Sequence, residues 1–178
     1  MKRYSVLAVV MFVAVLVAGP RVVGALSVEG PLILTEAQTE TIADNCTVSK
    51  IALGQVHSND AAMRVNIGQE YANISSRLMA PLNSRISLAG RDGVQLTQIT
   101  ADYNTVLQEF RAAYRLYDNA VLEALGIDCR TKQAEYYAAV LVARQERAKV
   151  REAVSQLSSL ATEYRSGVTD FRHSLGQD

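Results

Sequence analysis

Three stretches of the sequence place apolar residues at alternating steps of three and four positions. The first stripe is made of Ile42, Cys46, Leu53, Val56, Met63, Ile67, Tyr71, Ile74 and Leu78, with Ser49 and Asp60 interrupting it. This spacing keeps one apolar face along a helix for many turns. Thr35, with Gln38 three residues further on, has the form of a capping box, so we expect a helix over about 36–88. Pro81 should kink or end this helix near Met79, because proline lacks an amide donor.

Two further stripes follow the glycine-containing turn at 88–93 and predict helices over about 94–125 and 132–172. The second stripe has the most regular spacing: Leu96, Ile99, Tyr103, Val106, Phe110, Tyr114, Tyr117, Val121 and Leu125. Arg144 and Arg147 interrupt the third, which includes Tyr137, Val140, Leu141, Val150, Val154, Leu157, Ala161, Tyr164, Val168 and Phe171. Short connections leave consecutive helices antiparallel. The sequence therefore predicts an all-α fold, an elongated antiparallel three-helix bundle or coiled-coil hairpin over 35–175.

The first 25 residues have the layout of a secretory signal. Lys2 and Arg3 precede an uninterrupted apolar run over 5–19, and Ala25 closes a stretch of small residues that a signal peptidase would cut. The alternative is an uncleaved N-terminal membrane anchor. Residues 26–34 are expected to form a spacer before the bundle. Either interpretation places the remaining chain outside the cytoplasm, secreted or anchored to the cell membrane.

Charge and composition narrow the classes of partner. The chain of 178 residues has 18 basic and 18 acidic side chains, and removing 1–25 leaves 15 basic against 18 acidic, a net charge of −3. Nucleic-acid binding needs an excess of basic residues, so no nucleic-acid partner is predicted. Expected partners are an envelope protein or a second copy of the chain as a homo-oligomer, with the membrane reached through the N-terminal segment if it stays uncleaved.

The two cysteines belong to different predicted helical regions. Cys46 lies about 45 residues before the turn near Arg91, and Cys129 lies about 38 residues after it, a mismatch of about 10 Å along a helical hairpin. Both cysteines should therefore lie at the same end of the bundle. A Cys46–Cys129 disulfide is expected in an exported protein, and two unpaired core thiols are the alternative.

Few side chains form a pattern typical of catalysis or of ligand binding. His57 and Asp60 lie three positions apart, yet nothing supplies the further ligands that a metal site needs. No glycine-rich phosphate loop and no nucleophile elbow occurs. We therefore predict no catalytic residue, no cofactor and no metal, and expect that the protein is not an enzyme.

Four tyrosines flank the loop that contains Cys129. Tyr114 and Tyr117 precede it, and Tyr136 and Tyr137 follow it, so all four should gather at one end of the bundle. Tyrosines are frequent anchors of protein interfaces, which makes them a possible interaction patch. Alternatively they complete the core at that end, with their hydroxyls toward water.

The same region carries a resemblance. The Tyr114 and Tyr117 pair, the loop Ile127-Asp128-Cys129-Arg130 and the segment with Tyr136-Tyr137 and Ala143-Arg144 resemble uncharacterised exported helical or coiled-coil proteins of saccharibacterial-type ultrasmall bacteria. The resemblance covers about a third of the chain and implies location and helical shape, with no assigned activity. We therefore expect a non-enzymatic cell-envelope protein that acts as a structural spacer or protein-interaction module. An extracytoplasmic holdase or a small-ligand-binding bundle is the alternative.

Overall fold

The computed structural model describes residues 33–175, and these residues form helices joined by short turns, as an all-α fold requires. The expected signal peptide or anchor over 1–25 and most of the expected spacer lie outside the described residues. The order along the chain is α1 (Glu36–Asp44), α2 (Cys46–Asn73), a π-helical segment η1 (Ile74–Met79), α3 (Ala80–Leu88), α4 (Val94–Gly126) and α5 (Gln133–Leu175).

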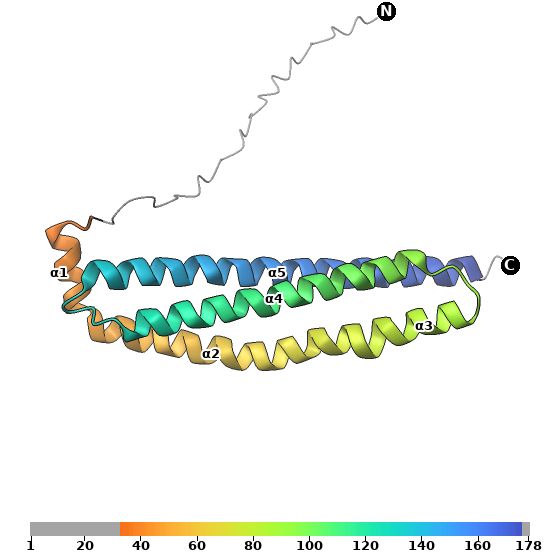
Figure 1. Cartoon of the computed structure of the whole chain (residues 1–178), viewed down its shortest axis with the longest axis horizontal. Helices are drawn as coiled ribbons and strands as arrows, with labels where there is room; N and C mark the ends of the chain where they lie inside the picture. Colours follow the sequence, from red (N-terminus) through yellow and green to blue (C-terminus); the bar gives the residue numbers. More distant parts are fainter. Residues whose placement is uncertain (1–32, 176–178) are drawn as a thin grey trace, which may run out of the picture. The chain divides into compact units, whose positions relative to one another are not determined.

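The helical region expected as one element over 36–88 is divided in the structure. A capping box starts α1: the Thr35 hydroxyl accepts from the Gln38 amide, and the Gln38 side chain accepts from the Thr35 amide. The chain then turns at Asn45 before α2 begins at Cys46. Figure 1 shows α1 set at an angle to α2, while α2, η1 and α3 follow one another as a single rod.

Pro81 explains the π-helical segment that precedes it. Proline has no N–H to donate to the carbonyl four residues earlier, so an α-helix cannot pass through it undisturbed. Here the helix widens before Pro81, and the Ala80 N–H donates to the Ser75 carbonyl five residues earlier. The hydroxyl of Tyr164, on α5, lies 3.2 Å from the Met79 carbonyl and supplies a donor there. The rod therefore continues through Pro81 instead of ending near Met79.

The most extensive contact between helices is that of α4 with α5, which lie side by side in Figure 1. Their core is made of residues spaced three and four apart: Leu96, Ile99, Tyr103, Leu107 and Phe110 from α4, and Ala153, Leu157 and Tyr164 from α5. A side chain at Gly167 would place its Cβ 2.9 Å from Leu96 Cδ2, so glycine permits the close approach of α5 to α4 there.

The helix α2 covers α4 less completely than α5 does. Within α2 the only buried residue is Cys46, whereas α3 and η1 bury Ile86 and Met79 in the core that α4 and α5 share. Because Cys46 starts α2 and Cys129 comes just before α5, these two helices begin at the same end, and α4 runs in the opposite direction. Side chains of α2, α4 and α5 line a groove between α2 and α5.

Candidate functional site

The Cys46–Cys129 disulfide fixes one end of this groove. The bond that the sequence predicts is present, and the two Cα atoms lie 5.4 Å apart. Both cysteines are buried with Tyr136 in a small cluster, and Ile42 of α1 and Val140 of α5 pack against it. The bond therefore joins the start of α2 to the loop between α4 and α5.

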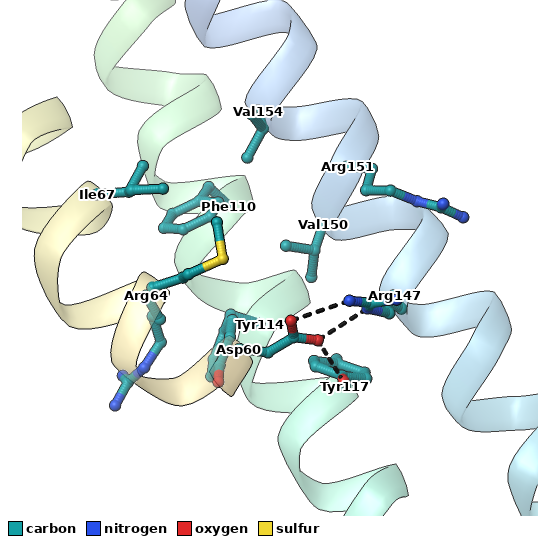
Figure 2. Close-up of a pocket in the computed structure, with 11 residues that line it drawn as sticks. Asp60, Arg64, Ile67, Phe110, Tyr114, Tyr117, Arg147, Val150, Arg151 and Val154 are labelled. Carbon is teal, nitrogen blue, oxygen red and sulfur yellow. Dashed lines mark hydrogen bonds and ion pairs between the residues drawn. The ribbon is translucent and has the colours of Figure 1, made fainter. Parts of the chain in front are cut away.

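A polar cluster bridges the groove further along, and Figure 2 shows it at the edge of a cavity. The Asp60 carboxylate, on α2, accepts two hydrogen bonds from the Arg147 guanidinium of α5, from Nε at 2.8 Å and from Nη2 at 2.9 Å. The Tyr117 hydroxyl, on α4, donates to the same carboxylate at 2.7 Å. One carboxylate thus links all three helices, and a bidentate pair of this kind fixes orientation as well as distance.

The electrostatics of Asp60 follow from these partners. Burial raises the pKa of the carboxyl group, but the hydrogen bonds from Arg147 and Tyr117 and the charges of Arg147 and His57 outweigh it, so the net pKa lies below the ordinary value of 3.8. Burial and the bond to Asp60 raise the pKa of the Tyr117 hydroxyl. A carboxylate with a lowered pKa is a weak base at neutral pH, so this arrangement suits a structural ion pair better than proton transfer.

This ion pair makes the stability of the fold depend on pH in the acid range. A pKa that is lower in the folded than in the unfolded state stabilises the fold above about pH 4, and the stabilisation is lost as the pH falls through the folded value. We expect Asp60→Asn to lower the free energy of unfolding by about 1–2 kcal/mol at neutral pH. The free energy of unfolding of this variant should also decrease less as the pH is lowered. Denaturant titrations across the acid range measure both effects.

The matched control for this prediction is Asp170→Asn, which changes an exposed aspartate near the end of α5. It should leave both the stability at neutral pH and its acid dependence within about 0.5 kcal/mol of the unchanged protein. Equal behaviour of the two variants would show that the Asp60 bridge contributes nothing to folding.

The histidine that the sequence singles out is part of a different pair. His57 Nε2 lies 2.7 Å from Asp118 Oδ1 of α4, so it contacts an aspartate on another helix and not Asp60 on its own. Over residues 33–175, no group of three or more His, Cys, Asp or Glu side chains is placed to hold a metal ion. His57 therefore adds a second polar link between α2 and α4.

A cavity of about 380 Å³ opens beside the Asp60 bridge, between α2 and α5. Its apolar lining comes from all three helices: Met63 and Ile67 of α2, Phe110 of α4, and Val150 and Val154 of α5. Three arginines also line it: Arg64, Arg147 and Arg151. The cavity thus combines apolar walls with guanidinium groups, and its volume lies at the lower end of the range for small-molecule sites.

Tyr114 lines the same cavity with an unusual polar group. Its side chain is 5% exposed, and its buried hydroxyl donates no hydrogen bond to a described residue. Arg64 stacks over its ring, with the guanidinium carbon 4.8 Å from the ring centroid, a cation–π contact. Burial raises the pKa of the Tyr114 hydroxyl, and Asp118 raises it further, while Arg64 acts against them. The hydroxyl is therefore a neutral donor at physiological pH.

The structure divides the four tyrosines of the expected interaction patch. Tyr114 and Tyr117 contact each other edge to face, with centroids 5.8 Å apart, in one core cluster, while Tyr136 packs on the disulfide. These three are buried, and Tyr137 is 38% exposed. Tyr117, Tyr136 and Tyr137 line one groove of about 560 Å³ between the disulfide and the Asp60 bridge. Among the four, Tyr137 alone presents substantial area to a partner.

The Asp60 bridge is the part of the site that the sequence analysis missed. In the sequence Asp60 and Arg147 interrupt two different apolar stripes, and neither interruption by itself identifies the other residue as a partner. Asp60 lies 14 residues after Cys46, the first residue of α2, and Arg147 lies 14 residues after Gln133, the first residue of α5. Since the disulfide brings these two helix starts together, equal distances along parallel helices place opposite charges at one level. The disulfide and the two charged interruptions, taken together, could have predicted this ion pair.

None of the helices over 33–175 is both long and apolar enough to cross a membrane. Comparison with known protein families, with curated proteins and with solved structures finds no match to this chain.

Proposed function

We propose that this chain is a non-enzymatic protein-interaction module of the cell envelope, an exported three-helix bundle that associates through the outer face of α2. The single observation that carries this proposal is an exposed, uncharged stripe along that helix. Its residues follow steps of three and four without a break: Val48, Ile51, Gln55, Ser58, Ala62, Val65 and Gln69.

The outer stripe of α2 has the properties of a helix-docking surface. Its apolar members are unusually accessible, with Val48 68% exposed, Ile51 58% and Val65 62%. The charged side chains nearest its centre, Asp60 and Arg64, line the cavity on another face of α2. The steps of three and four are those with which one helix packs along another. An uncharged strip with exposed apolar side chains on an exported domain is typical of an interaction site.

The occupant we propose is the same stripe of a second copy. A twofold interface places one surface against itself, so a charged stripe would repel its own copy, and an uncharged one does not. Small residues such as Ala62 and Ser58 near the centre allow two helices to approach closely. Self-association would lengthen the structure or pair two chains at the cell surface, which suits a spacer.

The compartment in this proposal rests on two independent features. Disulfides persist in oxidising environments outside the cytoplasm, and the Cys46–Cys129 bond is closed and buried. The apolar run over 5–19 with its basic start is typical of export. The resemblance to exported helical proteins of saccharibacterial-type bacteria points to the same location.

A charge placed on the stripe tests the proposal. We expect the oxidised chain from residue 27 onward to dimerise with rising concentration, and Ala62→Glu to weaken that dimer by about 100-fold, because two carboxylates would face each other across the twofold axis. Glutamate is a good helix former, so α2 itself should persist. Sedimentation equilibrium over a concentration series measures the dimer constant.

The control is Ser159→Glu, which adds the same charge at an exposed position of α5. It should dimerise like the unchanged chain. A protein that stays monomeric at every concentration, or a dimer equally weakened by both substitutions, would refute the α2 interface. In the first case, retention of envelope proteins on the immobilised oxidised chain would identify a different partner.

A further inference from the structure

The cavity beside the Asp60 bridge carries an excess of positive charge. Of the three arginines that line it, Arg147 is neutralised by Asp60 through two hydrogen bonds. Arg64 and Arg151 form no ion pair with any described carboxylate. Two of the three guanidinium charges at this cavity are therefore uncompensated, although the domain as a whole is mildly acidic.

The walls between these two arginines are apolar. Figure 2 shows Ile67 on one side of the opening, Val150 and Val154 on the other, and Phe110 between them. Met63 also lines the cavity. Met63 is 55% exposed, so filling the cavity would remove apolar surface from water. A ligand that matches both the uncompensated arginines and the apolar walls needs an apolar body and one anionic group.

The hydroxyl of Tyr114 adds a buried donor that has no acceptor among the described residues. A buried hydroxyl that donates no hydrogen bond is unfavourable for the fold, so this one calls for an explanation. Tyr114 lines the cavity beside Arg64, where an anionic group or the water that accompanies it would accept its hydrogen bond. The charge excess and the unpartnered donor point to one kind of ligand.

We propose that this cavity binds a single-chain amphipathic anion, a medium-chain carboxylate, with its chain along Met63, Ile67, Val150 and Val154 and its head group near Arg64 and Arg151. The inference is independent of the α2 interface, because it uses a different face of α2. The volume of about 380 Å³ accommodates one short chain and not a two-chain lipid.

Binding requires two arginine side chains to rearrange. In Figure 2 the guanidinium of Arg151 extends away from the cavity, while its stem lies at the rim. Long arginine side chains move their charged ends readily while their stems stay on apolar surface. The Arg64 guanidinium, which stacks on the Tyr114 ring, also extends away from the apolar walls, on the side opposite to Arg151. We therefore expect both side chains to turn toward the carboxylate.

The methionines of the domain allow a direct test. Met63 lines the cavity, and Met79 is buried in the core of η1, α4 and α5, so methyl-labelled methionine reports on the site and on a distant reference in one spectrum. We expect titration with decanoate to shift the Met63 methyl signal and to leave that of Met79 unchanged. Assignment follows from Met63→Leu. An unchanged Met63 signal at saturating decanoate would overturn the proposal.

Ligand and protein variants then separate charge from apolar contact. Decanoate should bind more tightly than decanol, and decyltrimethylammonium should bind least. Replacing both Arg64 and Arg151 by glutamine should weaken decanoate binding about fivefold or more and leave decanol binding unchanged, while Arg165→Gln, at an exposed position of α5, should change neither. Equal affinity for decanoate and decanol, or equal loss in the Arg165→Gln control, would reject an anion site.

Discussion

Opening the Cys46–Cys129 disulfide is expected to lower the free energy of unfolding by about 4 kcal/mol, the largest effect that we predict for this chain. The bond joins residues 83 positions apart, and closing so long a loop removes much of the conformational entropy of the unfolded state. The bond also gathers Ile42, Tyr136 and Val140 into one buried cluster. Denaturant unfolding of the oxidised and reduced chains measures the difference.

The control for this prediction is the double variant Cys46→Ala, Cys129→Ala. It should unfold at the lower stability of the reduced chain, and reductant should leave it unchanged. The pairing has its own check, because alkylation of the chain unfolded in denaturant without reductant should add no label. Two labels on every chain would show that the thiols are free in the protein as purified.

Leu157→Ala should produce the second largest loss, about 3 kcal/mol. Leu157 is fully buried where α5 packs on α4, and truncating a buried leucine removes apolar contacts and leaves a cavity. Alanine favours helix at least as well as leucine, so the loss would come from packing and not from helix propensity. Denaturant or thermal unfolding followed by circular dichroism measures the change.

Leu116→Ala is the matched comparison, because it makes the same substitution on α4 at a side chain that is 54% exposed. Its stability should stay within about 0.5 kcal/mol of the unchanged protein. Similar losses from both leucines would mean that Leu116 is covered in solution, for example by another chain, and would direct attention to the outer face of α4.

The helices of the described residues were predictable from sequence because they depend on local signals. The spacing of Leu96, Ile99, Tyr103 and Phe110 defines one face of a helix without any knowledge of its neighbours, and all four are buried. Thr35 and Gln38 likewise form the capping box that their identities predict. The disulfide needed only the hairpin geometry and the rise of a helix.

The remaining features depend on which helix meets which, and the sequence does not state this. The interrupted stripe on α2 meets the core only in part: Leu53 and Tyr71 pack against it, whereas Val56 and Met63 are exposed. The Asp60 bridge and the cavity required the register of α2 against α5. Tyr114 was recognised as a candidate, but its hydroxyl lacks an acceptor among the described residues because of packing that no spacing rule describes.

The π-helical segment also determines which face of α2 is presented outward. Each residue of an α-helix turns the chain by about 100°, so the wider turn over Ile74–Met79 changes the phase between α2 and α3. On one side of it, Ile86 of α3 faces the core; on the other, Asp60 faces the groove and Val65 faces solvent. Pro81 thereby changes the rotation of α2 relative to α3, and the orientation of the outer face of α2, more than ten residues away, depends on an amide hydrogen that proline lacks.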